Sequence, residues 1–323
     1  MIVGVSPAIR RALVLDERYA RTSLPVLLVG ATGTGKELFA EHIHERSGRP
    51  GPLVDVNCGA LPREMVESLL FGHRRGAFTG AVDSKVGHVE RSDGGTLFLD
   101  ELESLAPEAQ AKVLRVLETG EVQPLGAPTK RRVDLRVIGA VQDGIGEALA
   151  GGRFRRDLFQ RVAGVIIDLP PLVARLEDVV PLARYFASLR DQELESDAAR
   201  ALLNYTWPGN VRELRLTIER AGQLEGNGSI SAGAVTEAID LGSVAQPVVK
   251  GCTDERALLL RMCETYHWNS TAITGAIGIS RTTLHRRLRE LGVSLRQAKK
   301  YHFVARCAEP FEPMDALNDQ DQP

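Results

Sequence analysis

The chain has 323 residues, enough for two or three domains, and 43% of them are apolar, enough to bury a sizeable core. Its formal charge is only −2, no apolar run approaches the roughly 18 residues of a membrane span, and the first residues lack the pattern of a signal peptide. The four cysteines show neither metal-ligand spacing nor a CxxC pair, so we expect free thiols in a cytoplasmic protein that does not associate with membranes.

Short apolar runs alternate with helical patterns from residue 25 to about residue 169. The runs at 26–29 and 97–99 are apolar throughout, which is typical of parallel strands covered on both faces. We expect strands at 25–30, 53–58, 95–101, 134–142 and 164–170, and helices at 36–47, 63–72, 106–120 and 156–162. This alternation predicts an α/β subdomain with a parallel sheet over residues 1–169.

The segment GATGTGK at 30–36 follows the first expected strand and opens a helix. A glycine-rich loop in this context binds phosphate, because backbone N–H groups and the helix N-terminus face the anion while the lysine reaches the outer phosphates. We therefore expect ATP to bind here. The candidate residues are Gly30, Thr32, Gly33, Thr34, Gly35, Lys36 and Glu37. Glu37 stands where such loops usually carry a hydroxyl ligand for magnesium, so the metal must be held by other groups; the alternative is a glycine-rich turn without a function.

Two carboxylates follow the apolar run at 97–99. Asp100 and Glu101 lie at the carboxyl end of a strand, where the ligands of open α/β sheets bind. As candidate catalytic residues, Asp100 would hold hydrated Mg²⁺ and Glu101 would polarise the attacking water. The alternative is a solvated acidic turn.

Four arginines lie close together between two glycines and the last expected strand: Arg153, Arg155, Arg156 and Arg161. One interpretation is a solvated basic face. The other is a set of arginine fingers that enter the nucleotide site of a neighbouring subunit and stabilise charge on the γ-phosphoryl group, which requires a ring or another oligomer.

Helical spacing without strands predicts a helical subdomain over residues 170–241, and the stretch 242–253 has the composition of a linker. Residues 254–295 contain three helical stretches, of which the last two are joined by a tight turn and predict a helix-turn-helix. The alternative is a small helical bundle with a charged face. The candidate DNA-binding residues are Arg281, Thr282, Thr283, His285, Arg286 and Arg289. Residues 296–323 form a tail whose acidic end we expect to be disordered.

These motifs, in this order, resemble the sigma-54-dependent transcriptional activators, which are bacterial enhancer-binding proteins of the AAA+ ATPase class with a factor-for-inversion-stimulation type helix-turn-helix domain. The resemblance covers nearly all of residues 3–293, and GAFTGA at 76–81 is its most specific motif. It implies an AAA+ core with a parallel sheet, a helical lid at 170–241 and assembly into a hexameric ring. It also implies that the GAFTGA loop touches sigma-54 through Gly76, Ala77, Phe78, Thr79, Gly80 and Ala81.

The same resemblance assigns roles to four further residues. Asn57 matches the asparagine that toggles the catalytic glutamate, although a turn-forming asparagine after a strand is the alternative. Arg155 and Arg161 match the paired arginine fingers, and Arg212 matches the sensor II arginine of the lid.

The chain departs from the family pattern in the sensor I strand, where Ala140 is followed by Val141 and Gln142 in place of the usual Thr and Asn. In the family this strand senses the γ-phosphate or the attacking water, so the departure is expected to affect the rate of ATP hydrolysis. Most family members begin with a sensory domain, whereas here the AAA+ signature begins at about Ile2, so we expect control by a trans-acting regulator or by mixed assembly with a paralogue.

The resemblance implies an activator that binds upstream enhancer DNA and couples ATP hydrolysis to remodelling of the closed complex of sigma-54 RNA polymerase. Two alternatives stay open. One is a DNA-binding regulator with weak or no ATPase activity, and the other is an AAA+ remodeller that acts on another partner.

Overall fold

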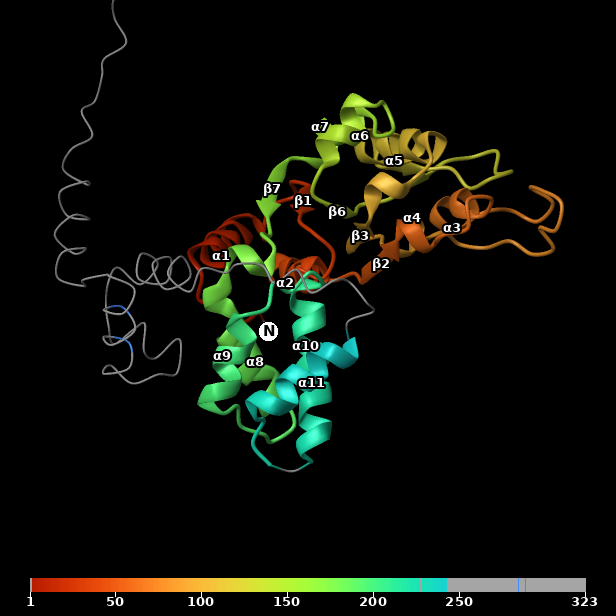
Figure 1. The fold of residues 1–323 in the computed structure, drawn as a ribbon. Coiled ribbons are helices and arrows are strands. Elements are labelled where there is room, and N and C mark those ends of the chain that lie inside the picture. The colour runs from red at the N-terminus through yellow and green to blue at the C-terminus, as the bar shows by residue number, and fades with distance from the viewer. Residues whose placement is uncertain (1, 227, 243–283, 285–287, 289–323) are drawn as a thin grey trace, which may run out of the picture. The chain divides into compact units, whose positions relative to one another are not determined.

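The computed structural model describes residues 2–226 and 228–242, together with positions 284 and 288 (Figure 1). The chain divides into two compact units, residues 1–244 and residues 245–323. Leu284 and Leu288, one helical turn apart, are both helical and buried. The rest of the expected helix-turn-helix, its candidate DNA-binding residues and the acidic tail lie outside the described residues.

The first unit contains a five-stranded sheet in which every neighbouring pair of strands is parallel, in the order β2-β3-β6-β1-β7. Its strands are β1 (Val26–Val29), β2 (Leu53–Asn57), β3 (Thr96–Asp100), β6 (Arg136–Val141) and β7 (Val165–Asp168). All five fall within the expected strand positions, which confirms the α/β class and the parallel sheet.

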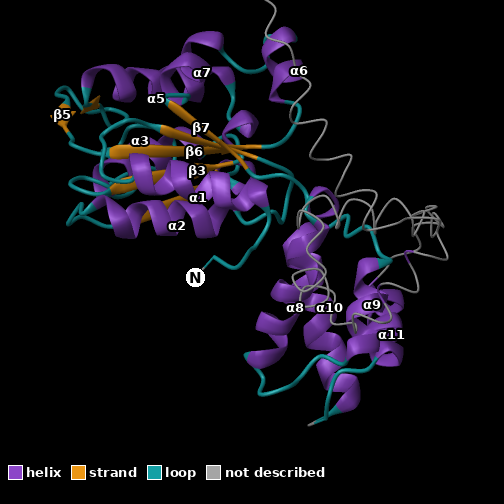
Figure 2. Cartoon of the chain, turned by 90° about the vertical axis from the view of Figure 1, so that its left-hand side faces the viewer, coloured by secondary structure: helices purple, strands orange, loops and turns teal. Residues whose placement is uncertain are grey.

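Helices cover both faces of this sheet (Figure 2). Helices α1 (Pro7–Tyr19) and α2 (Lys36–Ser47) share one apolar core with inward-facing residues of β1, β6 and β7. On the opposite face α3 (Val66–Phe71), α5 (Pro107–Thr119) and α7 (Arg156–Val162) form a second core. Burial on both faces explains why the strands are apolar without alternation.

Several elements of this unit are absent from the sequence-based expectations. They are α1, α4 (His88–Arg91), α6 (Ile145–Ala150), the two-residue strands β4 (Glu121–Val122) and β5 (Arg131–Arg132), and the 3₁₀ turns η1 (Cys58–Ala60) and η2 (Leu102–Ser104). Helix α1 has clear start signals, because the Ser6 hydroxyl accepts a hydrogen bond from the N–H of Ile9 and Pro7 occupies the first helical position.

Between residues 170 and 242 the structure describes the 3₁₀ turns η3 (Leu172–Ala174) and η4 (Leu176–Asp178) and then four helices: α8 (Val179–Ser188), α9 (Ser196–Leu203), α10 (Asn210–Glu225) and α11 (Ala232–Gly242). Trp207 lies in their core with 1% of its surface exposed, and its indole N–H donates to the carbonyl of Leu202 at 2.9 Å. Within the described part of the chain, no helix is long and apolar enough to cross a membrane.

Candidate nucleotide-binding site

The parallel strands end along one edge of the sheet, and the registers Val29↔Val141 and Asn57↔Asp100 bring their last residues level. The chain leaves β1 through the glycine-rich loop, where Gly33 and Gly35 have φ values of 79° and 107°. These values favour glycine, and Gly35 immediately precedes α2. The loop therefore presents the N-terminus of α2 at this edge.

The edge of the sheet and the helical subdomain enclose a pocket of about 420 Å³, a volume suited to a small-molecule ligand. Nine of its lining residues were expected from the sequence: Thr32, Gly33, Gly35, Lys36, Glu37, Asn57, Asp100, Glu101 and Arg212. The remaining lining residues are Leu38, Glu41, Phe186, Val211 and Arg215. The structure therefore brings together candidates that lie up to 180 positions apart in the sequence.

Lys36 is 8% exposed, and its ammonium group donates to the carbonyls of Gly30 at 2.7 Å and Ala31 at 3.2 Å. Gly30, one of the candidate residues, therefore contributes its backbone carbonyl, which accepts a hydrogen bond from the lysine. Thr34 points its hydroxyl at the Ala31 carbonyl, 2.8 Å away, and lines a smaller neighbouring pocket.

Asp100 ends β3, and its Oδ1 accepts a hydrogen bond from the backbone N–H of Glu101 at 3.0 Å. Glu101 has a φ of 52°, a left-handed conformation that is uncommon for a non-glycine residue and that occurs at functional sites. Asn57, which faces Asp100 in the register, accepts a hydrogen bond from the N–H of Ala60 at 2.9 Å. Its side chain thus caps η1, as the turn-forming alternative requires, while also lining the pocket.

The N-terminus of α10 contacts the glycine-rich loop at 30–35 directly. The N–H groups of Val211 and Arg212 donate to the carbonyl of Gly33 at 2.9 Å and 3.3 Å. The side chain of Asn210 accepts from the N–H of Leu172 at 2.7 Å and donates to the carbonyl of Thr32 at 3.0 Å. These contacts hold the lid helix on the loop.

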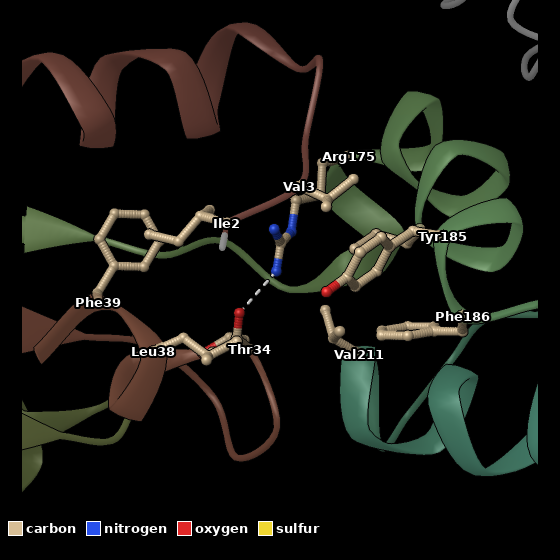
Figure 3. A pocket seen from close by; sticks show the side chains of 11 residues that line it. Ile2, Val3, Thr34, Leu38, Phe39, Arg175, Tyr185, Phe186 and Val211 are labelled. Carbon is tan, nitrogen blue, oxygen red and sulfur yellow. Dashed lines mark hydrogen bonds between the residues drawn. The ribbon is translucent and has the colours of Figure 1, made fainter. Parts of the chain in front are cut away.

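A smaller, mainly apolar pocket adjoins the main one and shares Gly35, Leu38, Phe186 and Val211 with it (Figure 3). Tyr185 lies on one side of this pocket in Figure 3, and Ile2 and Phe39 lie on the other. Apolar side chains on both sides of this pocket suit a flat apolar group that lies next to a phosphate site.

Arg175 closes the smaller pocket and is 3% exposed. Its guanidinium donates to the Thr34 carbonyl at 2.9 Å, the dashed line in Figure 3. The neighbouring Asp178 accepts from the N–H groups of Val5 and Ser6 through Oδ1, the second of these at 2.8 Å. The 175–178 turn therefore connects the phosphate-binding loop to the segment before α1.

Several carboxylates lie near the carboxyl ends of β2 and β3. Burial raises the pKa of the Cys58 thiol, and the carboxylates of Asp100, Glu103 and Glu101 raise it further. The pocket itself is lined by four acids and three bases: Glu37, Glu41, Asp100, Glu101, Lys36, Arg212 and Arg215. Carboxylate oxygens are the ligands that Mg²⁺ prefers, so this set of donors fits a hydrated magnesium ion bound together with phosphates.

The pocket lining of the same chain lacks four of the candidates for the nucleotide site: Gly30, Thr34, Arg155 and Arg161. Arg155 is exposed and pairs with Asp157 at 2.7 Å, and Arg161 donates to the carbonyl of Leu117 at 2.9 Å. Of the pocket's lining residues among positions 2–226 and 228–242, none belongs to β6. Val141 at its end is fully buried, and the N–H of Gln142 donates to Glu103 at 2.9 Å.

The GAFTGA motif forms a loop between α3 and α4, drawn in orange in Figure 1. Phe78 is 44% exposed, and its ring meets that of His73 edge-on with centroids 5.1 Å apart. The N–H of Gly76 donates to the carbonyl of Ala81 at 2.9 Å, and this bond closes the tip of the loop. The N–H of Arg74 donates to the carbonyl of Leu125 at 2.9 Å, and this bond joins the base of the loop to the β4–β5 connection. An exposed aromatic side chain thus stands on a loop supported at its base.

The main omissions from the sequence-based site are Arg175, Asn210 and Phe186. Arg175 and Asn210 lie within the stretch that resembles the family, but neither is a residue to which the resemblance assigns a role. Phe186 gave no signal, because an aromatic residue on an amphipathic helix usually packs in a core.

Comparison with known proteins agrees with this geometry. A family model described as the Sigma-54 interaction domain matches residues 2–168, just over half of the chain, and one described as an AAA+ ATPase lid domain matches residues 174–248. The crystal structure of NtrX from Brucella abortus in complex with ADP is similar with a TM-score of 0.69 and 30% identity, over 91% of this chain and 70% of that one.

Two curated relatives are transcription regulators from Cupriavidus necator. The hydrogenase transcriptional regulatory protein HoxA is 41% identical over 299 residues, 85% of this chain and 62% of HoxA. The nitric oxide reductase transcription regulator NorR1 is 50% identical over 228 residues, 68% of this chain and 44% of NorR1. The chain thus spans less than two thirds of either relative. With its parallel sheet, phosphate-binding loop and helical lid, the chain belongs to the family of sigma-54 interaction domains of the AAA+ type.

Proposed function

We propose that the chain binds ATP in the 420 Å³ pocket and hydrolyses it in an oligomeric ring. The cycle would move the GAFTGA loop against sigma-54 in the closed RNA polymerase complex, while residues 254–295 bind upstream DNA. One observation carries the proposal: Lys36, Asn57, Asp100, Glu101 and Arg212 line a single pocket although they come from separate elements. The ADP in the NtrX structure and the regulatory roles of the relatives support it.

The phosphates would lie against the loop, where the N-terminus of α2 attracts negative charge. Lys36 would exchange the carbonyls of Gly30 and Ala31 for phosphate oxygens, and Arg212 would approach the same phosphates from α10. The base would enter the adjoining apolar pocket beside Tyr185. Glu101 would accept the proton of the attacking water, the role of a general base.

Magnesium would be held by Asp100 through water, since α2 begins Lys36-Glu37 and supplies no hydroxyl ligand. When bound, it neutralises charge on the phosphates. The four carboxylates around the pocket carry the same sign of charge as the phosphates. The nucleotide would therefore be bound by the N-terminus of α2, Lys36 and the two arginines of α10, Arg212 and Arg215.

Completion of the site would need a second copy of the chain. Arg155 and Arg161 are exposed on α7 and its preceding turn and lie outside their own pocket. An arginine supplied by a neighbour stabilises the charge that develops on the γ-phosphoryl group. Ring assembly would thus make hydrolysis depend on the contact between subunits.

A second candidate is a DNA-binding regulator with weak or no ATPase activity. The end of β6 favours it, because Val141 is an apolar, buried residue at the sensor I position and no β6 residue lines the described pocket. Release of phosphate from ATP by the purified protein separates the two, since a regulator of this kind would bind its operator without turnover.

The test of the proposed function replaces Phe78 or Thr79 by alanine. Both residues are exposed on the loop and do not line the pocket, so ATP turnover should stay near that of the unmodified protein. Open-complex formation on a sigma-54 promoter should be lost, because the contact with the polymerase is removed.

The matched control is Val82→Ala, which removes an apolar side chain that is 71% exposed just outside the motif. This variant should keep both activities. Full promoter opening by Phe78→Ala and Thr79→Ala would contradict the assigned role of the loop, and loss of ATP turnover in both would show that the substitutions act on the fold instead.

A further inference from the structure

A separate pocket of about 250 Å³ lies between the end of α3, helix α5 and the β4–β5 connection, and we call it the α3–α5 pocket. Its volume is just below the roughly 300–1,000 Å³ of typical ligand pockets, so it suits a small molecule. Within the part of the chain that the structure describes, it shares no lining residue with the pocket of about 420 Å³. The proposed function therefore leaves the α3–α5 pocket without a role.

The lining of the α3–α5 pocket carries an excess of positive charge. Among the described residues that line it, three are basic, Lys112, Arg115 and Lys130, and one is acidic, Glu121. Glu121 pairs with Lys130 at 3.0 Å, and Lys112 pairs at 2.8 Å with Glu67, which lies outside the lining. Both lysines thus have a carboxylate partner.

Arg115 is the cation that these pairs leave over. Its side chain is exposed on α5 and makes no hydrogen bond or ion pair with another residue of the described ranges 2–226 and 228–242. A guanidinium presents a planar fork of N–H donors that matches the oxygens of a carboxylate or a phosphate group. Arg115 therefore favours an anionic group in this pocket.

Apolar groups form much of the remaining wall. Phe71, the last residue of α3, and Val116 of α5 are both buried, and Pro124 and Leu125 belong to the β4–β5 connection. The ammonium group of Lys112 lies 5.9 Å from the centroid of the Phe71 ring, within the range at which a cation and an aromatic face attract each other. A ligand could bury an apolar body against these groups while its charged group meets the basic side chains.

Two segments of this wall continue into the base of the GAFTGA loop. Phe71 precedes Gly72, whose carbonyl accepts a hydrogen bond from the N–H of Leu125 at 2.9 Å. The carbonyl of Leu125 in turn accepts from the N–H of Arg74 at 2.9 Å. A ligand that contacts both Phe71 and Leu125 would hold the two segments together, so these bonds would open less often while it is bound.

We propose that the α3–α5 pocket binds a small organic anion, an apolar molecule with one carboxylate or phosphate group, and that the bound anion stabilises the base of the GAFTGA loop. Binding is independent of the proposed function, whereas an effect on promoter opening rests on it. The pocket would be an effector site beside the loop that carries Phe78.

Benzoate and phenyl phosphate are the probes, since they share an apolar ring and differ in the anionic group. A titration followed by NMR signals of the probe should give a dissociation constant below about 5 mM for at least one of them, and the tighter probe identifies the preferred anionic group. Benzamide has the shape of benzoate without its charge, and acetate lacks the ring. Each should bind about tenfold more weakly or worse, because one half of the interaction is missing.

Arg115→Ala should weaken binding of the probe about tenfold or more, because charge-assisted hydrogen bonds are lost. Arg115→Lys keeps the charge without the fork and should bind with intermediate affinity. The matched control is Arg184→Ala, which removes an exposed arginine of α8 outside the pocket lining and should bind like the unmodified protein. Phenyl phosphate that bound at the nucleotide site instead would not respond to Arg115→Ala.

Amide hydrogen exchange tests the link to the loop without ATP. At a probe concentration ten times the dissociation constant, exchange at Arg74 and Leu125 should slow about tenfold. The amide of Val165, which donates to Pro25 at 3.0 Å, should exchange as before.

Dissociation constants above about 5 mM for both probes would overturn the anion site, as would equal binding by the Arg115→Ala variant. Unchanged exchange at Arg74 and Leu125 while the probe is bound would overturn the link to the GAFTGA loop.

Discussion

Partial burial lowers the pKa of two histidines in the folded chain, His44 and His88. Both pKa values lie below the ordinary value of 6.5. For His44, burial outweighs the opposing effect of Glu45 and Arg49 lowers the pKa further, and for His88 Arg91 and Lys85 lower it further. The Nδ1 of His44 lies 2.8 Å from the Thr96 hydroxyl. A group with a lower pKa when folded adds stability above its unfolded pKa, and that stability is lost as the pH falls through the folded pKa.

We therefore expect the midpoint of thermal unfolding to fall when the pH is lowered from about 7.5 to about 5.5. His44→Asn, which can keep a hydrogen bond to Thr96, should make this dependence shallower. Thermal melts of the two proteins across the pH series measure the difference. Parallel curves would show that His44 does not titrate differently in the folded and unfolded states.

At the residue scale the sequence predicted the groups that belong to short motifs. Lys36, Asp100 and Glu101 were expected because their types and spacing are fixed by phosphate chemistry. Arg175 was not, since its partner Thr34 lies 141 positions away and only the fold brings them together. The φ of Glu101 likewise depends on backbone geometry that no spacing encodes.

Helix α10 depends on one asparagine at its start. Asn210 has a φ of 55°, is 3% exposed, and connects Leu172 to Thr32 through its side chain. Asn210→Ala would leave the buried N–H of Leu172 without its partner, remove the bond to the part-buried carbonyl of Thr32 and place alanine in a left-handed conformation. We expect a loss of about 1–3 kcal/mol in the free energy of unfolding for the buried unpaired group.

Thermal or denaturant unfolding measures this loss, and ADP affinity should fall with it because the helix no longer holds the loop. The matched control is Asn204→Ala, at an exposed position after α9, which should change stability little. Equal stability of the two variants would show that the contact between α10 and the loop contributes nothing to the fold.

Elements bounded by clear sequence signals were predictable, and elements defined by tertiary contacts were not. Helix α2 begins and ends at the expected residues, 36 and 47, because a loop of glycines precedes it and Gly48, with a φ of 73°, follows it. Strands β4 and β5 are two residues each and carry no measurable alternation. Their connection matters nonetheless, since a β-carbon on Gly126 would lie 2.9 Å from that of Ala77 in the GAFTGA loop.

For the molecule as a whole, the central claim is a nucleotide site shared between two copies of the chain. Lys36, Asp100 and Glu101 line the pocket of one copy, while Arg155 and Arg161 are exposed and do not line it. Heterologous contacts of this kind close into rings, in which every interface contributes one such site. Turnover per subunit should therefore rise with protein concentration as the ring assembles.

A mixing experiment tests this claim most directly. The Lys36→Ala variant keeps Arg155 and Arg161 but lacks the lysine that would bind phosphate. The double variant Arg155→Ala/Arg161→Ala keeps the lysine but lacks both arginines. Each variant alone should therefore be inactive. In an equal mixture, about a quarter of the interfaces join an intact loop to intact arginines, and ATP turnover should return to about that fraction. A mixture as inactive as its components, or full turnover by the double variant alone, would contradict the shared site.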